Sequence, residues 1–411
     1  MASKIYILGG HQTDFSANWK RQDRDVLDVF SDCLNQGLEQ TKLDYSDLDC
    51  GHVGNFAGEL FNHQGIMGGY FGMVDPRLSG LPTARHEAAC ASGSIALLAA
   101  TAELEANRYG LACIIGIEQM RNVPGAEAAA YLGSATWAGH ECQGIKFPWP
   151  HMFGKLGDEY DKRFGLKQEH LAGIAKINFA NAKRNPNAQT RKWQFTDDSF
   201  VENDETNPVI DGRIRKQDCG QVTDGASVIF LAHEDRARDY AKSRGLSFDD
   251  MPYIEGWGHR SAPLELERKM AESAQSDFVF PHVNGTITDA YRRAGLENVS
   301  AIDTIETHDC FTTTEYMAID HFGITAPGES WKAIEEGRIA MDGDIPINPS
   351  GGLIGCGHPV GATGVRMLLD AYKQVSGTAG DYQVAGAKRA QTLNIGGSGT
   401  TSVSFIVGKS A

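Results

Sequence analysis

The sequence of 411 residues predicts an α/β protein, and three observations support this fold class. Short apolar runs alternate with helical patterns along the chain, which is typical of folds with mainly parallel sheets. Segments that start at Cys90 and at His358 share an architecture of a reactive residue, small residues and then a helix, which indicates an internal repeat. Glycine is in excess, with 47 of 411 residues, so we expect several close backbone approaches.

In the first half of the chain, residues 5–8 predict a first strand, and residues 26–40 predict a helix because their apolar positions recur at helical spacing. Residues 111–117 form a short apolar run that predicts a buried strand. Residues 121–218 are rich in Asn, Pro, Trp and charge, with a helical stretch at 168–183. This composition predicts a long excursion from the core, and such excursions usually carry binding function.

In the second half, residues 302–307 predict a strand and residues 314–322 predict a helix. Two β-rich runs, 390–395 and 402–407, flank a glycine cluster and predict a pair of adjacent strands.

Composition excludes several classes of protein. Lys plus Arg total 38 and Asp plus Glu total 53, so the net charge of −15 disfavours nucleic-acid binding. No apolar run approaches the ~18 residues that span a bilayer. The eight cysteines include no C-x-x-C pair, and no secretory leader is visible. We therefore expect a cytoplasmic protein with reduced thiols, no metal and no cofactor.

Cys90 precedes Ala-Ser-Gly-Ser, where a turn of small residues opens a helix. The free N–H groups and the dipole at a helix N-terminus favour a thiolate, so this position predicts a nucleophile with a lowered pKa. The same amides would stabilise an oxyanion beside the sulfur. The alternative is a buried structural cysteine, which is the usual fate of a free thiol.

His358 lies among four glycines between Gly355 and Gly364, and Pro359 suits the first turn of the next helix. Imidazole titrates near neutrality, so His358 is a candidate base for a thiol, and a helix cap is the alternative. His308-Asp-Cys-Phe311 lies at a strand-to-helix turn. There, Asp309 is a candidate cap and Cys310 a candidate core residue, and no ligand spacing supports a metal site.

Taken together, these motifs resemble the thiolase superfamily. Cys90-Ala-Ser, His308-Asp-Cys-Phe, Gly357-His-Pro and Gly396-Gly-Ser-Gly occur in the order and spacing of thiolases, and His-Asp-Cys-Phe is most similar to thiolases of the sterol-carrier-protein type. Ile115-Gly-Ile-Glu-Gln-Met resembles another thiolase strand end, and His151-Met resembles the start of the loop-domain helices. The resemblance covers nearly the whole chain.

The resemblance implies a thiolase fold of duplicated β/α halves in five α-β-α-β-α layers. The halves would span residues 1–250, with a loop domain inserted at about 121–218, and residues 251–411. It implies that Cys90 is acylated and that His358 activates it. One oxyanion hole would come from His358 and a water near His308, and the other from the N–H groups of Cys90 and Gly396.

One position departs from the family. Many thiolases carry a second catalytic cysteine in a Cys-x-Gly motif, and here Asn394 takes that place before Gly396. By resemblance, Cys310 inherits the proton-transfer role, with Cys356 as its rival. We also expect Asn394 to contact the substrate.

The implied activity is that of an acyl-CoA:acetyl-CoA C-acyltransferase, which cleaves 3-oxoacyl-CoA or condenses acetyl-CoA through an acyl-Cys90 intermediate. On an acidic protein the phosphates of coenzyme A need local cations. The candidates are Lys183, Arg184, Arg191, Arg213 and Lys216, although a solvated basic face is the alternative for each. By resemblance, His151 and Met152 would line the path of the pantetheine arm.

Two other functions stay open. Condensing enzymes of the ketoacyl synthase kind share the fold and a Cys nucleophile, but Cys310 speaks against decarboxylative chemistry. Some thiolase-like chains act as non-catalytic scaffolds with a small OB-fold partner, and Asn394 keeps that alternative open. The resemblance further implies a homodimer or a dimer of dimers, with acyl-CoA and coenzyme A as ligands and no nucleic acid or membrane.

Overall fold

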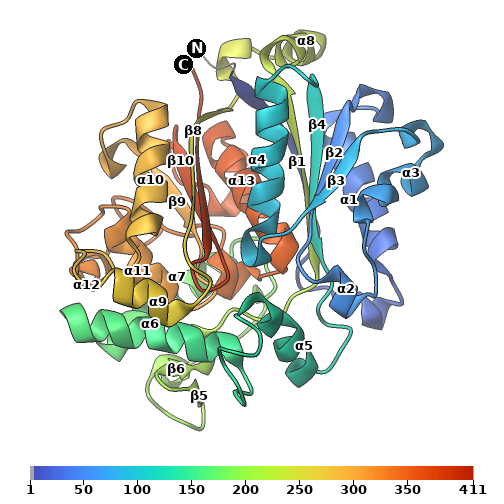
Figure 1. Ribbon diagram of the computed structural model, residues 1–411. Helices are drawn as coiled ribbons and strands as arrows, with labels where there is room; N and C mark the ends of the chain where they lie inside the picture. The colour runs from blue at the N-terminus through green and yellow to red at the C-terminus, as the bar shows by residue number, and fades with distance from the viewer. Residues whose placement is uncertain (1–3, 411) are drawn as a thin grey trace.

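The computed structural model describes residues 4–410, and Figure 1 shows two β-sheet halves with helices between and around them. Residues 1–3 and residue 411 lie outside this range. The expectation about a secretory leader concerns the N-terminus and so falls partly on residues that are not described. Within residues 4–410, no helix is both long and apolar enough to cross a membrane.

The strands of the first sheet half lie in the order β3-β2-β4-β7-β1, and those of the second in the order β8-β11-β10-β9. The first half contains β1 (Ile5–Gln12), β2 (Cys50–Gly54), β3 (Thr83–His86), β4 (Leu111–Glu118) and β7 (Gly225–His233). The second contains β8 (Tyr253–Ser261), β9 (Thr304–Thr307), β10 (Ala390–Gly396) and β11 (Thr401–Gly408). The halves join at one pairing, Tyr6 with Tyr253.

The strand pairing repeats between the halves. In the first half β2 is parallel to β4, which is antiparallel to β7, which is antiparallel to β1. In the second half β9, β10, β11 and β8 follow the same sequence of pairings. The predicted duplication is therefore present in the topology.

The expectation of mainly parallel sheets was wrong. Parallel pairing is confined to β2–β3, β2–β4 and β9–β10, and the other pairs of the large sheet are antiparallel. A helical crossover makes two neighbouring strands parallel, but it connects only some of the neighbouring strands here. The long excursion lies between β4 and β7, and a tight turn joins β10 to β11, so these pairs are antiparallel.

Helices complete five layers (Figure 1). Helices α4 (Ser92–Glu105) and α13 (Val360–Ser376) pack on each other between the sheet halves. Helix α1 (Val26–Thr41) covers the outer face of the first half, and α10 (Pro281–Ala294) covers that of the second. The remaining helices of the two halves are α2 (Gly58–Phe61), α3 (Tyr70–Val74), α8 (Glu234–Arg244), α9 (Leu266–Glu272), α11 (Thr312–His321) and α12 (Ser330–Glu335).

The central helices approach so closely because glycine lies at their contact. A Cβ atom at Gly364 of α13 would lie 2.4 Å from the backbone nitrogen of Ser94 in α4. A Cβ atom at Gly93 would lie 2.8 Å from the carbonyl oxygen of Gly361. Side chains at these positions would force the helices apart. The segments that carry Cys90 and His358 are thereby held side by side.

The predicted excursion contains α5 (Gly125–Leu132), α6 (Pro148–Phe164), α7 (Gln168–Ala182) and the strand pair β5 (Val209–Asp211) and β6 (Ile214–Arg215). It lies between β4 and β7 in the chain, and α5, α6, β5 and β6 form the lower end of the molecule in Figure 1. Its buried side chains, including Met152 and Leu156, share a core with α11. This packing brings the excursion against the second half of the chain.

Candidate active site

Cys90 occupies a short 3₁₀ turn, Ala89–Ala91, directly before α4. Ala89 has a φ of +48°, a left-handed conformation that side-chain-bearing residues seldom adopt. The Ser92 hydroxyl accepts the Ala88 N–H at 2.9 Å and donates to the Ala89 carbonyl at 2.6 Å. These bonds hold the strained turn, and the half-buried thiol opens into a cavity.

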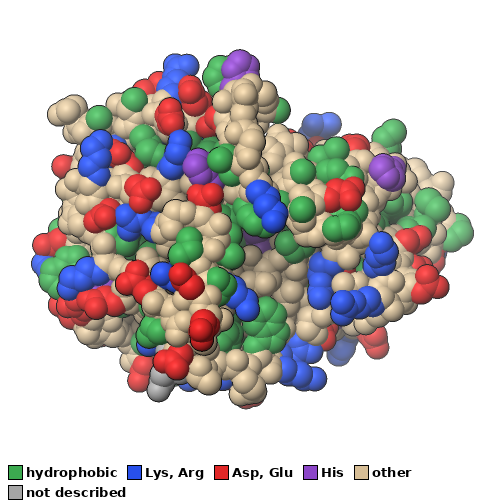
Figure 2. Space-filling view, turned by 90° about the horizontal axis from the view of Figure 1, so that it is seen from below, with side chains coloured by type: hydrophobic (Ala, Val, Ile, Leu, Met, Phe, Trp, Pro, Cys, Tyr) green, Lys and Arg blue, Asp and Glu red, His purple; other side chains and the backbone are tan. Residues whose placement is uncertain are grey.

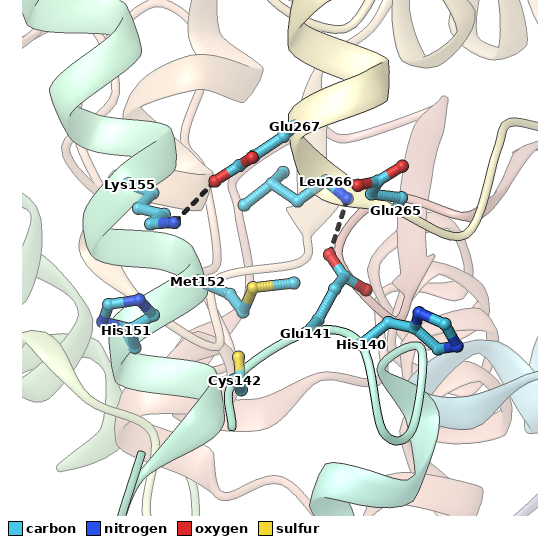
Figure 3. A pocket seen from close by; sticks show the side chains of 9 residues that line it. All are labelled: His140, Glu141, Cys142, His151, Met152, Lys155, Glu265, Leu266 and Glu267. Carbon is cyan, nitrogen blue, oxygen red and sulfur yellow. Dashed lines mark hydrogen bonds and ion pairs between the residues drawn. The ribbon is translucent and has the colours of Figure 1, made fainter. Parts of the chain in front are cut away.

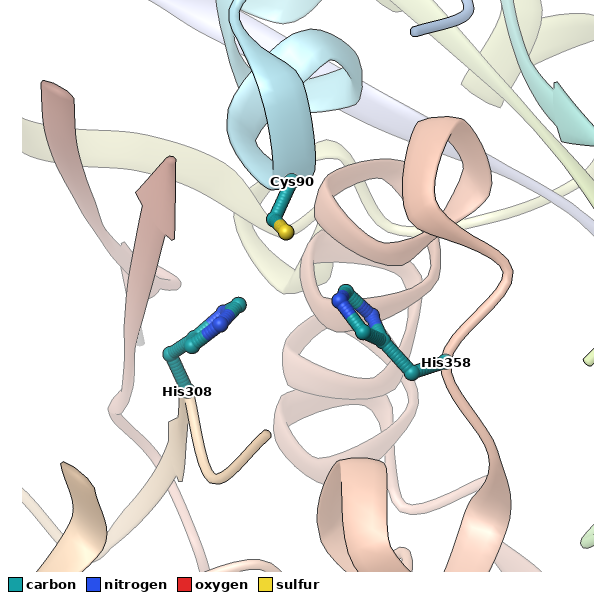
Figure 4. Close-up of side chains that lie close together, drawn as sticks. All are labelled: Cys90, His308 and His358. Atoms are coloured by element: carbon teal, nitrogen blue, oxygen red, sulfur yellow. The ribbon is translucent and has the colours of Figure 1, made fainter. Parts of the chain in front are cut away.

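Two histidines converge on this thiol from the second half of the chain (Figure 4). His308 follows β9, and His358 precedes α13. One side-chain donor atom from each of Cys90, His308 and His358 lies within 4.8 Å of the others. The two imidazole centroids are 5.3 Å apart, with planes inclined at 88°. The structure thus brings together three residues that the sequence separates by up to 268 positions (358 − 90).

The hydrogen bonds of His358 assign its tautomer. Its Nδ1 lies 2.8 Å from the Thr363 hydroxyl oxygen, and that hydroxyl donates its one proton to the Pro359 carbonyl at 2.9 Å. We therefore assign the proton of neutral His358 to Nδ1, from which Thr363 accepts. The Nε2 atom of His358 is buried and has no hydrogen-bond partner among the residues that the structure describes. It carries a lone pair and can accept a proton inside the site.

The opposite tautomer follows for His308. The Ser94 hydroxyl donates to Asn394 Oδ1 at 2.8 Å, so the Asn394 amide NH₂ faces His308 Nδ1 at 3.1 Å. Nδ1 accepts this bond, and the proton of the neutral ring sits on Nε2, which is also buried without a partner. His308 thus offers a donor where His358 offers an acceptor. Asn394 is buried and donates to His308, and its expected contact with the substrate stays a prediction.

Burial keeps both rings neutral and the thiol protonated. It lowers the pKa of His358 to about 3, and it lowers the pKa of His308 well below its ordinary range, with a further contribution from His358. Burial also raises the pKa of Cys90 to about 12, assisted by the charge of Glu118. The N–H groups of Cys90 and Gly397 lower this pKa, but by less than burial raises it. The predicted lowering of this thiol pKa was wrong because desolvation outweighs the helix start.

Cys310 lines the same cavity as Cys90 and His358. Its thiol lies 3.7 Å from the Thr314 hydroxyl, and burial raises its pKa well above the ordinary value. The rival cysteine, Cys356, does not line this cavity. Its sulfur accepts from Gln12 and Asn185 and packs in a separate buried cluster with Phe15.

The cavity has a volume of about 410 Å³. Most of its walls are apolar, and they come from α5, the start of α6, the segment before β7 and the segments that carry Cys90, Cys310 and His358. Apolar lining residues include Met120, Ala126, Ala129, Leu132, Phe147, Pro148, Trp149, Phe153, Val222, Phe311 and Val360. Figure 2 shows the face with α5 and α6 hollowed near its centre, with hydrophobic and basic side chains around the hollow.

Two buried carboxyl groups fix the surrounding loops. Glu118, at the end of β4, accepts the N–H groups of Phe56, Ala57 and Gly361 at 2.9 to 3.1 Å. Asp309 accepts the N–H groups of Leu353 and Ile354. Burial raises the pKa of each to about 7. Asp309 therefore clamps the loop before His358, and the predicted helix cap was wrong.

The turn between β10 and β11 closes the site beneath Cys90. The carbonyl of Gly396 accepts the Thr400 N–H at 3.0 Å, and Gly397 has a φ of +62°, which glycine adopts without strain. The buried Lys269 ammonium donates to the Ser398 and Thr400 hydroxyls at 2.8 and 3.2 Å. Burial lowers the pKa of Lys269 to about 8. Within the turn, the Gly397 N–H acts on the Cys90 sulfur, and the role of the Gly396 N–H in an oxyanion hole stays a prediction.

The two residues predicted to line the pantetheine path lie outside the Cys90 cavity, and their contact with that arm stays a prediction. His151 and Met152 line a separate pocket of about 160 Å³ with Lys155 and Glu141 (Figure 3). His151 Nδ1 lies 2.9 Å from an oxygen of Asp211. Neither residue lines the Cys90 cavity, whereas Trp149 and Phe153 of the same helix do.

The predicted phosphate-binding cations also lie apart from the Cys90 cavity. Lys183 and Arg184 line a surface groove at the end of α7 that shares no residue with the cavity. Arg213 forms ion pairs with Asp158 at 2.7 Å and with Asp161 at 2.8 Å, so its charge is already compensated.

Four residues that line or support the Cys90 site were not predicted from the sequence: Ser94, Lys146, Lys269 and Thr363. Among residues 4–410, Lys146 is the cation that lines the Cys90 cavity. Ser94 lies four residues after Cys90, and Thr363 five after His358. Both hydroxyls lie in the first turns of the helices that follow Cys90 and His358, and this position near the helix starts is the signal that could have indicated them. No sequence pattern indicates Lys269, because its partners come from the β10–β11 turn.

This chain matches known protein families and relatives along most of its length. The family model "Thiolase, N-terminal domain" matches residues 5–235, and "Thiolase C-terminal domain-like" matches residues 265–409. An acetyl-CoA acetyltransferase of Methanothermobacter thermautotrophicus is 30% identical over 410 residues, covering 98% of both chains. Human sterol carrier protein 2 is 27% identical, over 98% of this chain and 71% of that protein.

Solved structures agree on the fold. The Ltp2–ChsH2(DUF35) aldolase superposes with a TM-score of 0.77 at 19% identity, covering 99% of this chain and 98% of that one. Human mitochondrial 3-ketoacyl-CoA thiolase superposes over the full length of both chains with a TM-score of 0.73 at 16% identity. With both family models and a 30% identical relative matched along nearly its whole length, this chain belongs to the thiolase superfamily.

Proposed function

We propose that the protein is an acyl-CoA:acetyl-CoA C-acyltransferase that works through an acyl-Cys90 intermediate. The observation that carries this proposal is the pair of opposite tautomers beside the thiol: an acceptor at His358 Nε2 and a donor at His308 Nε2. Nucleophilic attack by a neutral thiol needs both functions at once, because a proton leaves sulfur while negative charge grows on the carbonyl oxygen.

In the cleavage direction, Cys90 Sγ attacks the 3-oxo carbon of the substrate and its proton passes to His358 Nε2. The carbonyl π electrons move to oxygen, which accepts a hydrogen bond from His308 Nε2–H. When the oxyanion collapses, the bond between carbons 2 and 3 breaks and leaves the enolate of acetyl-CoA. The Cys310 thiol protonates carbon 2, so acetyl-CoA departs and Cys310 becomes a thiolate.

The second half-reaction restores every group. The Cys310 thiolate takes the proton of the incoming coenzyme A thiol, whose sulfur attacks the acyl-Cys90 thioester. Cys90 leaves as a thiolate and recovers its proton from the His358 imidazolium. In the reverse direction, the Cys310 thiolate removes a proton from carbon 2 of acetyl-CoA for Claisen condensation. Two half-reactions through one covalent intermediate predict ping-pong kinetics.

The cavity walls support an apolar acyl group on the substrate. Phenyl, indole and aliphatic side chains surround the thiol, so an alkyl chain would remove apolar surface from water on binding. Lys146 at this cavity is our candidate for a coenzyme A phosphate. Lys183 and Arg184 remain predictions for such a contact and would act outside the cavity.

The test traps the intermediate. After mixing with acetyl-CoA, intact-mass spectrometry should detect one acetyl group on the wild-type protein and on Cys310→Ala, and none on Cys90→Ala. Steady-state thiolysis by Cys310→Ala should fall by about 10²- to 10⁴-fold, because an acid–base catalyst is lost. Cys356→Ala is the matched control, since its buried thiol lies outside the cavity, and it should keep both properties.

Two outcomes would contradict the proposal. Absence of acetylation on folded wild-type protein would favour a non-catalytic scaffold that works with a partner. Equal, complete loss of acylation in Cys90→Ala and Cys310→Ala would overturn the division of roles.

A decarboxylative condensing enzyme is the second candidate, because a cysteine flanked by two neutral histidines also suits that reaction. It requires no thiol at position 310. Condensation that depends on malonyl-CoA and survives Cys310→Ala would favour this function, whereas dependence on acetyl-CoA alone would support the thiolase activity.

A further inference from the structure

A second cluster of thiol, imidazole and carboxylate lies at the opposite end of α4 from Cys90. Cys50 and His52 belong to β2, Glu103 lies in the last turn of α4, and His86 ends β3. Side chains two residues apart on a strand point to the same face, so Cys50 and His52 both face α4. The proposed acyltransferase reaction uses none of these four residues.

The donor atoms are spaced like the ligands of one metal ion. His52 Nε2 lies 3.2 Å from Glu103 Oε2 and 3.8 Å from Cys50 Sγ, and the three donor atoms lie within 4.8 Å of one another. A tetrahedral zinc ion, with bonds of about 2.3 Å to sulfur and about 2.0–2.2 Å to nitrogen and oxygen, separates its nitrogen and oxygen ligands by roughly 3.3 Å. It separates nitrogen and sulfur by roughly 3.5 Å.

The surroundings suit coordination. Cys50 and His52 are buried, whereas the Glu103 side chain is 28% exposed and leaves a route for an ion and a solvent ligand. His52 Nδ1 lies 2.9 Å from His86 Nε2. Metal-bound histidines commonly donate their other N–H to such an outer partner, which fixes the ring.

We propose that Cys50 Sγ, His52 Nε2 and Glu103 Oε2 bind a divalent transition-metal ion of the zinc type, with water as the fourth ligand and His86 as the outer partner of His52. A sulfur, nitrogen and oxygen donor set favours zinc or cobalt over magnesium or calcium. On binding, the Cys50 proton leaves to solvent. His52 carries its proton on Nδ1 and donates it to His86 Nε2, and His86 keeps its own proton on Nδ1.

The ion would join β2 to the end of α4, and so fasten the helix whose other end carries the nucleophile. The site forms only in the folded chain, because its ligands come from residues 50–52 and 103. Metal binding should therefore stabilise the fold.

The experiment uses Cys90→Ala protein, because Cys90, His308 and His358 also bring three donor atoms within 4.8 Å and would compete for metal. Titration with Zn²⁺ by calorimetry should give one equivalent bound, with a rise in Tm. Co²⁺ should give a sulfur-to-cobalt charge-transfer band. Adding Cys50→Ser should abolish the band and weaken Zn²⁺ binding at least ~100-fold, and adding His86→Gln should weaken it about 10-fold.

Cys113→Ser in the same background is the matched control, since Cys113 is a buried thiol on the neighbouring strand β4 outside the cluster. It should bind metal like its parent. If Cys50→Ser impairs folding, Glu103→Gln at the partly exposed ligand should still weaken binding more than ~10-fold. Either the absence of saturable Zn²⁺ binding, or binding that neither Cys50→Ser nor Glu103→Gln changes, would overturn the proposal. Because the background cannot be acylated at Cys90, neither result depends on the proposed acyltransferase function.

Discussion

The two ends of α4 carry similar side chains in different arrangements. At its start, the Cys90 thiol faces His308 and His358. At its end, about 20 Å away for a helix of this length, Cys50 meets His52, His86 and Glu103. Burial raises the pKa of both thiols to about 12 and lowers the pKa of all four imidazoles. Composition and burial alone therefore do not distinguish the clusters.

The hydrogen bonds of the imidazoles and the space beside each thiol distinguish the two clusters. In the Cys90 cluster, each histidine leaves Nε2 without a partner, and the thiol opens into a cavity of about 410 Å³. In the Cys50 cluster, both nitrogens of His52 already have partners. A free lone pair, a free N–H and room for a substrate are what acyl transfer requires. Satisfied imidazole nitrogens around a thiol instead suit a structural role or a bound ion.

The largest expected difference is in acylation of the nucleophile. His358→Ala removes the acceptor for the thiol proton and should slow acetylation of Cys90 by about 10³-fold, within the usual contribution of a general base. His52→Gln should leave the rate within about twofold of wild type. Rapid-quench mass spectrometry of Cys90 acetylation measures both. A similar loss in the two variants would show that the contrast between the clusters is false.

A smaller effect tests how the tautomers are fixed. Thr363→Val removes the acceptor for His358 Nδ1–H, and Asn394→Leu removes the donor to His308 Nδ1. Each should lower kcat about 10- to 100-fold with little change in KM, because an incorrectly protonated ring is present in the ground state.

Thr101→Val in α4 is the matched control for this pair. The Thr101 hydroxyl makes the same bond to a carbonyl four residues earlier, Leu97, but contacts no histidine. It should leave kcat unchanged. Wild-type kcat in Thr363→Val would contradict the assignment of His358 as the proton acceptor.

The smallest effect concerns stability and pH. An unfolded imidazole takes up a proton near pH 6.5, whereas folded His358, with a pKa of about 3, does not. Lowering the pH from 7 to 5.5 therefore favours the unfolded chain, and His358 should account for about 1 kcal/mol of the lost free energy of unfolding. His358→Asn should show a correspondingly weaker pH dependence in urea denaturation.

His86→Gln should change the pH dependence in the same direction, since burial also lowers the pKa of His86. Burial raises the pKa values of Glu118 and Asp309, so these carboxyl groups make the folded protein more stable as the pH falls. They are present in every variant, so the difference in pH dependence between wild type and variant reports on the histidine alone. A wild-type slope in His358→Asn would mean that this ring is charged in the folded protein.

Much of the architecture could be predicted from local pattern. The helix predicted at residues 26–40 occupies Val26–Thr41, and the strand predicted at 111–117 occupies Leu111–Glu118. Both signals are local, because they depend on apolar periodicity within one element. The pairing direction of the strands was not predictable in this way, since it depends on where the excursion and the β10–β11 turn enter the sheet.

The pocket that a side chain on α6 lines could not be predicted from local sequence pattern. His151 and Met152 share α6 with Phe153, but they line a different pocket from it. Which face of α6 turns toward Cys90 depends on packing against the second half of the chain. Arg213 likewise gave a basic signal in the sequence, while the fold places two carboxylates beside it.

The sequence by itself determined the family and the repeated β/α architecture, and it proposed Cys90, His308, Cys310 and His358 as site residues, because these depend on residue type, order and spacing. The tertiary structure decided what each group can do. The direction of each thiol and imidazole pKa depends on burial, the two tautomers depend on Thr363 and Asn394, and the distinction between the two ends of α4 depends on which nitrogens have partners. Protonation follows from the three-dimensional surroundings of a side chain, and those surroundings come from segments far apart in the chain.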